Sequence, residues 1–216
     1  MLKLEDIGFS SLTKRLMDLL VASGLLFLTF PVFIITAVAI KLDSRGPVFF
    51  RQMRTGKGQR QFICYKFRSM YVGSNSKIHQ EYIKELMTED SAQKKQSGKV
   101  FKLTDDPRIT PVGRLIRKLS IDELPQLFNV LKGQMSMVGP RPAIFYELKY
   151  HTDAMLKRFT VKPGITGLWQ ISGRSALGYK EMVALDISYI DHWSTWLDLR
   201  IILKTVLYVL KISHAY

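Results

Sequence analysis

The feature that most constrains this chain is an uncharged stretch of 22 residues, Leu19 to Ile40, near the start of the sequence. A membrane hydrocarbon core about 30 Å thick needs roughly 20 apolar helical residues to cross it, so this stretch is long enough to enter a membrane. Pro31 lies within the stretch, lacks a backbone N–H and clashes with the preceding helical turn. We therefore expect a kink or a break there that divides the stretch into two short helices.

Basic residues flank both ends of this stretch. Lys14 and Arg15 precede it, and Lys41 and Arg45 follow it. Because lysine and arginine favour the cytoplasmic side of a membrane, both ends are expected on that side. A re-entrant helix-break-helix, which enters one leaflet and returns, satisfies this expectation. A kinked single span and a signal peptide ending at residues 37–39 are the alternatives.

The composition indicates one basic domain with a membrane appendage. The 216 residues suffice for a membrane segment over 1–45 and one compact cytoplasmic domain over 46–216. The net charge of +14 favours anionic partners, which include nucleic acid, anionic lipid and phosphorylated small molecules. The single cysteine, Cys64, excludes internal disulfides and a cysteine-based zinc site, which indicates a reducing compartment. We expect Cys64 to be buried in a strand.

The first part of the cytoplasmic domain is expected to contain a small β-sheet. Two runs rich in Phe, Val, Ile and Tyr, 47–54 and 61–68, flank a turn at 55–58 and predict a β-hairpin. Residues 72–99 are polar and mixed in charge, which predicts a mobile surface excursion.

The remainder of the domain is expected to be rich in helix, so the fold class is α+β. Apolar spacing over 111–131, interrupted near Ser120, predicts two joined helices. Residues 193–216 predict an amphipathic helix with a basic stripe and two preceding tryptophans, which suits a membrane interface as well as it suits packing into the core. Glycine- and proline-rich stretches at 133–142 and 163–178 predict ordered loops that can present backbone amides to a ligand.

The run from Ser120 to Pro125 places two adjacent carboxylates, Asp122 and Glu123, after a basic segment. Ser120 and Glu123 have the spacing of a capping box, and Asp122 would favour the positive end of a helix dipole. The same position would lower the pKa of Asp122 and keep it ionised, and a helix N-terminus also binds phosphate. Helix capping and a nucleophilic carboxylate beside a bound phosphate are both consistent with this run.

Arg141 lies between Pro140 and Pro142. The two proline rings restrict the backbone, so the guanidinium would lose little entropy on binding a pair of phosphate oxygens. Further basic candidates for phosphate binding, each of which alone is also compatible with a solvated charge, are Lys66, Arg68 and Arg174.

Four segments of the sequence carry a family resemblance. They are KFRSM (66–70), DPRITPVGRLIRKLSIDELPQLFNVLKG (106–133), MSMVGPRP (135–142) and PGITGLWQISGRS (163–175). Together with the proline-containing hydrophobic stretch they resemble the bacterial sugar transferase family, the monotopic phosphoglycosyl transferases. The resemblance covers nearly the whole chain, and the motifs occur in the family's order.

The resemblance implies a monotopic enzyme of the bacterial inner membrane whose active site faces the cytoplasm. Its reaction would transfer a sugar-1-phosphate from a UDP-sugar to undecaprenyl phosphate and release UMP. Asp122 would be the nucleophile that forms a phosphosugar-enzyme intermediate, and Mg²⁺ would lie against Asp122 and the diphosphate. Glu123 would assist Asp122. The residues that match basic positions around the phosphates are Lys66, Arg117, Arg141 and Arg174.

The sequence departs from the family pattern at two positions. Phe30 precedes Pro31 where members often have serine, and Thr29 could satisfy the freed backbone in its place. Gln134 stands where many members have an acidic residue. We expect catalysis to survive this second change.

The resemblance also bears on substrates and partners. The Gly-Arg-Ser motif followed by Glu181 and Asp186 is more similar to members that use simple hexoses, so we expect UDP-glucose or UDP-galactose, with a modified N-acetylated sugar as the alternative. Members start O-antigen, capsule or exopolysaccharide assembly. The expected partners are a UDP-sugar, undecaprenyl phosphate and membrane lipids, with no nucleic acid; a homodimer stays open. A non-enzymatic adaptor that binds anionic lipid is the competing hypothesis, but it leaves the acidic pair within a basic region unexplained.

Overall fold

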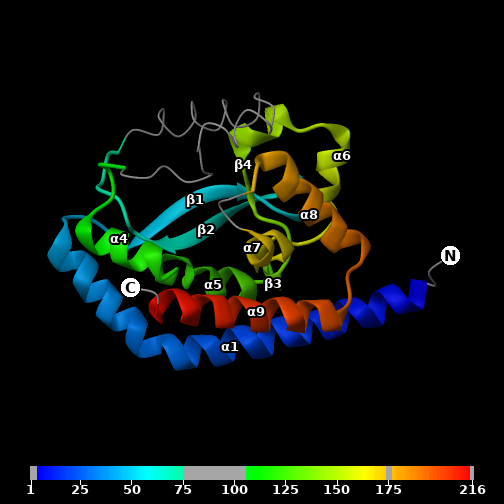
Figure 1. Cartoon of the computed structure of the whole chain (residues 1–216), viewed down its shortest axis with the longest axis horizontal. Coiled ribbons are helices and arrows are strands. Elements are labelled where there is room, and N and C mark those ends of the chain that lie inside the picture. The colour runs from blue at the N-terminus through cyan, green and yellow to red at the C-terminus, as the bar shows by residue number, and fades with distance from the viewer. Residues whose placement is uncertain (1–3, 75–105, 174–176, 215–216) are drawn as a thin grey trace.

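The computed structural model describes the backbone of residues 4–74, 106–173 and 177–214. In this part of the chain helices surround two small sheets, which confirms the helix-rich α+β class (Figure 1). Helix α1 (Leu4–Asp43) and helix α9 (Thr195–His214) run side by side along one edge of the molecule, and the sheet that contains β1 and β2 lies on the other side of helix α5 (Figure 1).

Helix α1 is continuous across Pro31. Its stretch Leu12–Asp43 is long and apolar enough to cross a membrane, and only 11% of its most apolar window is buried. The helix bends strongly along its length (Figure 1). The prediction of a kink is therefore confirmed, whereas the expected division into two separate helices is not.

Thr29 does not satisfy the backbone group that proline frees. Its hydroxyl donates to the carbonyl of Leu25 at 2.7 Å. Pro31, in contrast, frees the carbonyl four residues before it, which belongs to Phe27. A threonine hydroxyl bonded to the preceding turn bends a helix slightly. Thr29 and Pro31 together therefore give a physical reason for the bend in α1.

The predicted hairpin is present. Strands β1 (Phe49–Thr55) and β2 (Gln61–Phe67) pair in antiparallel fashion and are joined through a short 3₁₀ turn, Lys57–Gln59. Strand β4 (Ala143–Ile144) extends this sheet on the far side of β1, in the order β2-β1-β4. Cys64 lies in β2 and is 1% exposed, as expected.

A buried side chain covers the outer edge of β2. Asn129, in helix α5 (Gln126–Leu131), accepts the backbone N–H of Tyr65 at 3.0 Å and donates to the carbonyl of Ile63 at 2.6 Å. It therefore takes the place of a neighbouring strand. Gln134, which departs from the family pattern, accepts a second N–H from Asn129 at 2.8 Å and so supports this edge.

Helices α4 (Pro111–Lys118) and α5 confirm the expected pair with an interruption near Ser120. The N-terminus of α4 is capped by Thr110, whose hydroxyl accepts the N–H of Gly113 at 2.9 Å. The glycine-rich stretches contain two strands that the sequence did not predict, because three residues leave too little periodicity to detect. These are β3 (Ser136–Val138) and β5 (Gly164–Thr166), which pair in parallel. Three further helices are α6 (Asp153–Leu156), α7 (Leu168–Ser172) and α8 (Tyr179–Asp191).

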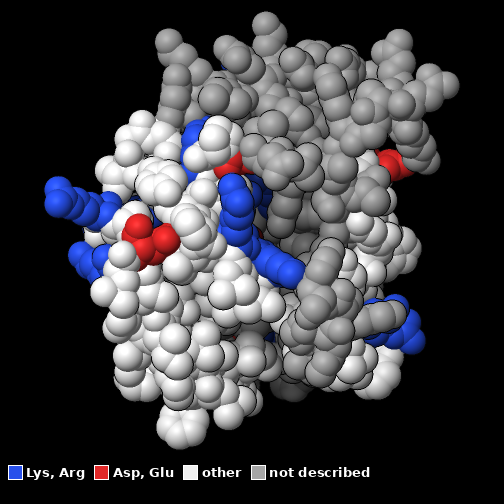
Figure 2. Space-filling model, turned by 60° about the vertical axis from the view of Figure 1, so that its left-hand side comes forward, with Lys and Arg blue, Asp and Glu red and all other residues white. Residues whose placement is uncertain are grey.

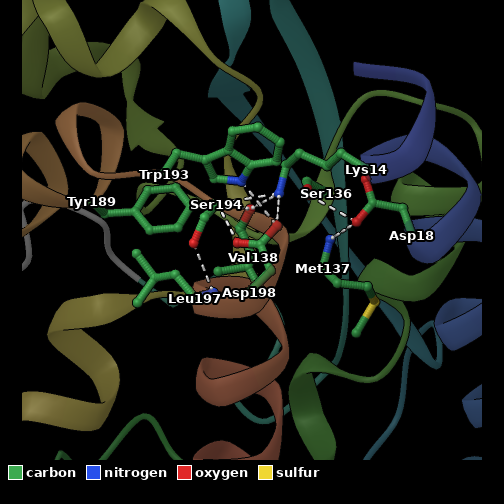
Figure 3. A network of polar contacts seen from close by, with 10 residues as sticks. All are labelled: Lys14, Asp18, Ser136, Met137, Val138, Tyr189, Trp193, Ser194, Leu197 and Asp198. Atoms are coloured by element: carbon green, nitrogen blue, oxygen red, sulfur yellow. Dashed lines mark hydrogen bonds and ion pairs between the residues drawn. The ribbon is translucent and has the colours of Figure 1, made fainter. Parts of the chain in front are cut away.

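A buried polar cluster joins α1 to α8 and α9 (Figure 3). Lys14 Nζ lies 2.6 Å from Asp198 Oδ2 and 3.1 Å from the hydroxyl of Tyr189. Asp198 is fully buried and also accepts the Tyr189 hydroxyl at 2.7 Å and the indole N–H of Trp193 at 3.0 Å. The carboxylate therefore has three donors, which is the condition under which a buried charge is tolerated.

The same cluster holds strand β3 (Figure 3). Lys14 donates to the carbonyl of Val138 at 3.1 Å, and Asp18 accepts the hydroxyl of Ser136 at 2.9 Å and the N–H of Met137 at 2.8 Å. The first half of α1 is thus part of the packed structure. The proposed boundary at residue 45 stays a prediction.

Helix α9 is packed against the domain, as one of the two alternatives for its sequence expected, and the membrane interface stays a prediction. Asp198 and Ile201 are buried against the domain. Leu199, Leu203 and Leu207 are exposed, so one side of α9 is packed while apolar side chains on it remain uncovered. The predicted excursion at 72–99 lies outside the described residues from position 75 onward.

Candidate active site

The acidic pair lies on a short 3₁₀ turn, Ile121–Glu123, between α4 and α5. Ser120 has a left-handed backbone with a φ of 57°, and its side chain makes no cap hydrogen bond. The predicted capping box is therefore wrong, because this conformation turns the chain between the two helices instead of starting one. The turn is too short to supply a helix dipole, so that argument for the ionisation of Asp122 also fails.

Glu123 interacts instead with strand β2. Lys66 Nζ lies 2.8 Å from Glu123 Oε1, and the two side chains are 24% and 40% exposed. Asp122 is half-buried next to this ion pair. Packing of the turn against β2 therefore brings together three of the candidate residues at a position that solvent reaches.

Arg141 acts electrostatically on the same buried thiol as Lys66 and Glu123. The pKa of the Cys64 thiol is raised by burial, while the charges of Lys66 and Arg141 lower it and that of Glu123 raises it. All three charges therefore lie within electrostatic range of one buried thiol. The Arg141 side chain is 17% exposed, and its Nη2 is 3.9 Å from Glu147 Oε1.

The backbone of the Pro-Arg-Pro loop is held by other segments of the chain. Each of its three carbonyl oxygens accepts a hydrogen bond from a distant residue. The donors are the N–H of Gly164 to Pro140 at 2.9 Å, the guanidinium of Arg158 to Arg141 at 3.1 Å, and the guanidinium of Arg54 to Pro142 at 3.0 Å. Tertiary contacts therefore add to the rigidity that the proline rings give this loop.

Two of these donors are buried arginines that the sequence analysis did not select. Arg54 is 7% exposed, and burial, followed by the charge of Arg141, lowers its pKa. Arg158 is 3% exposed and forms an ion pair with Asp186, with Nη2 to Oδ2 at 2.8 Å. Glu147 is also buried, and its Oε2 accepts the N–H of Ile144 at 3.1 Å. Arginine and glutamate are normally exposed, so the sequence carries no local signal for their burial.

The remaining basic candidates take different positions. Arg68 is buried at the end of α1, where it donates to the carbonyls of Ile40, Ser44 and Arg45 at 3.2, 2.7 and 3.1 Å. It closes the C-terminus of this helix, so we do not include it in the proposed site. Arg117 is half-buried on α4, and Arg174 lies outside the described residues.

The two acidic residues that suggested simple hexoses have structural partners. Glu181 Oε2 accepts the N–H of Gly178 at 3.0 Å and caps α8. Asp186 is 1% exposed and paired with Arg158. The expectation of a simple hexose therefore depends on the family resemblance alone.

The surface near the site is divided by charge. Figure 2 brings the left-hand side of Figure 1 forward and shows Lys and Arg side chains close to acidic ones in the upper part of this face. Among the described residues, those in the lower part of the face are almost all uncharged. The apolar side chains exposed on α1 include Leu20, Phe27 and Ile35. The charged surface thus adjoins an apolar one.

The residues of the acidic turn fit one mode of Mg²⁺ binding. Among the described residues, no three His, Cys, Asp or Glu side chains gather into a metal cage. Mg²⁺ is usually held by one or two carboxylates together with substrate phosphates and water. Two adjacent carboxylates beside a half-exposed lysine, as in Asp122, Glu123 and Lys66, suit this second mode.

The chain is similar to known proteins over most of its length. The model of the family described as bacterial sugar transferase matches residues 9–212. Over 207 residues the chain is 44% identical to an undecaprenyl-phosphate galactose phosphotransferase of Salmonella typhimurium and 42% identical to a UDP-galactose-lipid carrier transferase of Erwinia amylovora, covering 96% of this chain and 42% of each relative. It is 40% identical over 195 residues to the exopolysaccharide production protein ExoY of Rhizobium meliloti, covering 90% of this chain and 84% of that protein. The chain thus spans less than half the length of the first two relatives.

Proposed function

The chain belongs to the bacterial sugar transferase family, and from this premise we propose that it transfers a sugar-1-phosphate from a UDP-sugar to undecaprenyl phosphate. The names of the Salmonella and Erwinia relatives support the lipid phosphate acceptor and the UDP-sugar donor, respectively. The observation that carries the proposal is the half-exposed Lys66–Glu123 ion pair beside Asp122, with Arg141 within range of the same buried thiol. Such a site offers a nucleophile and cations for phosphate in one place.

The proposed reaction proceeds in two phosphoryl transfers. An oxygen of Asp122 attacks the sugar-bearing phosphorus of the donor, the bond from that phosphorus to the bridging oxygen breaks, and the oxygen leaves with UMP. An oxygen of undecaprenyl phosphate then attacks the same phosphorus. The bond to Asp122 breaks, and the carboxylate is regenerated with the sugar diphosphate now on the lipid.

The other site residues bind and orient the phosphates. Lys66 and Arg117 supply positive charge for the diphosphate, and Arg141 supplies a guanidinium held by Pro140 and Pro142 that can bind two phosphate oxygens. Glu123 fixes the Lys66 ammonium at 2.8 Å next to the nucleophile. We keep Arg174 as a further proposed phosphate ligand from the family motif.

We propose that Mg²⁺ binds at the acidic turn. Asp122 would hold it, with the donor's diphosphate as its other ligands. When bound, it would neutralise the charge that develops as UMP leaves.

We propose that α1 is a re-entrant helix in the bacterial inner membrane and that the domain faces the cytoplasm. Basic residues at both ends of the apolar stretch, the bend of α1 and the uncharged surface in Figure 2 support this placement. The exposed leucines of α9 would lie at the same membrane surface.

Cysteine labelling tests this topology. In a Cys64→Ser background, single cysteines at Glu5 and Arg45 should both be protected from an impermeant thiol reagent added outside spheroplasts, and both should react after lysis. A spanning helix would expose one of them. Labelling of the cysteine at position 5 from outside would rule out the re-entrant model.

The donor sugar is proposed to be glucose or galactose, and the product to begin a surface polysaccharide. The name of the galactose phosphotransferase supports a hexose donor, and the name of the exopolysaccharide production protein ExoY supports a polysaccharide product. A panel of UDP-sugars that includes N-acetylated ones, assayed for UMP release with purified protein, tests it. Preference for an N-acetylated donor would replace the hexose assignment.

One experiment separates covalent from direct transfer. With UDP-sugar and Mg²⁺ but no lipid acceptor, the protein should release at most one UMP per active site and carry a labelled phosphosugar. Undecaprenyl phosphate should then remove the label. If no bond breaks until both substrates are present, transfer is direct and Asp122 is not the nucleophile.

A further inference from the structure

A buried ion pair holds the peptide of Arg141 through its carbonyl group. Arg158 Nη2 donates to the Arg141 carbonyl at 3.1 Å. Arg158 and Asp186 bind each other through two contacts, Nε to Oδ2 at 2.9 Å and Nη2 to Oδ2 at 2.8 Å. Asp186 therefore fixes the arginine that holds the loop.

This ion pair is set deep in the domain. Arg158 and Asp186 are 3% and 1% exposed, and they connect the 3₁₀ turn Lys157–Thr160 to the middle of α8. The hydroxyl of Tyr179 lies 3.4 Å from Arg158 Nη1 and also contacts His151 at 2.6 Å. A buried ion pair contributes little net stability compared with apolar residues of the same size. Its contact with the peptide of Arg141 therefore calls for another role.

We propose that Arg158 and Asp186 are positioning residues for Arg141. This inference rests on the proposed function, in which Arg141 binds a phosphate of the donor. The direction of a side chain is set by its own backbone, and the pair holds the carbonyl group of that backbone through Arg158. The guanidinium of Arg141 is thus fixed relative to Asp122 before the donor arrives, and a displacement of about 1 Å at a reacting group can lower a rate about 100-fold.

The planar geometry of the arginine side chain is needed to hold the loop in this way. Its planar fork can donate to the Asp186 carboxylate and to the Arg141 carbonyl in one fixed geometry, whereas a lysine ammonium is a point charge on a flexible stem. Arg158→Lys would therefore keep the buried charge balanced but loosen the hold on the loop. This variant separates the position of Arg141 from the charge of the pair.

The test measures UMP release and thermal unfolding of the full chain in detergent, with UDP-galactose, UDP-glucose and Mg²⁺. Arg158→Lys should lower kcat/KM by about 10- to 100-fold while the protein stays folded. In an Arg141→Ala background the same change should cost less than about 2-fold, because the residue it positions is already gone. An undiminished loss in that background, or full activity of Arg158→Lys, would overturn the proposal.

A second variant covers the case in which Arg158→Lys does not fold. Arg158→Met combined with Asp186→Leu removes both charges, so no buried charge is left unpaired. If this protein folds and its kcat/KM falls, the positioning role is supported. If it folds and keeps wild-type activity, the pair is only structural and the proposal is wrong.

A matched control lies next to the pair. Lys157 and Asp191 form an exposed ion pair between the same 3₁₀ turn and the end of α8, without contact to the loop. Lys157→Gln with Asp191→Asn should leave kcat/KM unchanged. Absence of UMP release by the wild-type protein with every UDP-sugar would refute the proposed function itself, an outcome distinct from failure in the variants alone.

Discussion

The acidic turn and the Pro-Arg-Pro loop both place a charge within electrostatic range of the Cys64 thiol, yet they are held in opposite ways. The turn at 121–123 is bonded mainly to its own neighbours, and its Glu123 forms an ion pair with Lys66 that solvent reaches. The loop at 140–142 has all three carbonyls bonded to residues from other segments, two of them buried arginines. In the proposed reaction this difference divides the roles of the two segments: the loop would hold phosphate in a fixed position, and the turn would supply reacting groups that solvent reaches.

The strongest test of this division is Asp122→Asn. The amide keeps the shape of the side chain but cannot act as the nucleophile, so UMP release should fall by about 1,000-fold or more. Because the amide has nearly the same size as the carboxylate and Asp122 is only half-buried, the melting temperature should change by less than about 2 °C. Comparable turnover in the Asn variant would exclude Asp122 as nucleophile.

Lys66→Met should also separate activity from stability. A partly exposed ion pair contributes less than about 1 kcal/mol, so unfolding should be nearly unaffected. If the ammonium binds the diphosphate, kcat/KM for the UDP-sugar should fall by about 10- to 100-fold. Lys57→Met, an exposed change in the hairpin turn, serves as the control. Equal kinetics of the two variants would remove Lys66 from the site.

Arg54→Met, in contrast to the two changes above, should lower the stability of the protein, because Arg54 supports the loop. It leaves the buried carbonyl of Pro142 without its donor, which should cost about 1–3 kcal/mol of unfolding free energy. The control is Arg51→Met, which alters an exposed residue of the same strand and should change stability by less than about 0.5 kcal/mol. Chemical denaturation measures both. A stability loss no larger than that of the control would show that the loop does not depend on Arg54.

The smallest expected effect is the contribution of His151, which contacts the hydroxyl of Tyr179, to the pH dependence of stability. Burial, followed by the charge of Arg158, lowers its pKa from the usual 6.5. The unfolded chain therefore takes up this proton at higher pH than the folded one, so stability is lost as pH falls through about 6.5 toward the folded pKa. Burial raises the pKa of Asp186 to about 6, which acts in the opposite sense.

Comparison with His151→Gln isolates the histidine, because Asp186 is present in both proteins. The drop in melting temperature between about pH 7.5 and about pH 5.5 should be smaller in the variant by about 1–2 °C. An identical drop in both proteins would mean that His151 titrates normally in the folded state.

Much of this architecture could be predicted from local patterns. The apolar stretch with Pro31, the hairpin around 55–58 and the helix pair interrupted at Ser120 each depend on residues close together in sequence, and all three are present. The capping box at Ser120 failed because the same spacing also fits a turn between two helices. Whether Ser120 caps or turns is decided by how α4 and α5 pack, which the spacing does not encode.

By itself the sequence determined the family, the apolar helix and the residues with reactive chemistry, because these follow from composition and from motifs continuous along the chain. Only the tertiary structure decided which charged residues lie at the proposed site and which hold other parts of the fold in place. Arg68 donates to the carbonyl of Ser44 at the end of α1, and Arg158 donates to the carbonyl of Arg141 in the loop. Lys66 instead forms an ion pair with Glu123. The sequence around each of these basic residues gives no local signal of whether its side chain is buried. Their roles differ because the free energy of a charge depends on its desolvation and its partners, and both are set by segments distant in sequence.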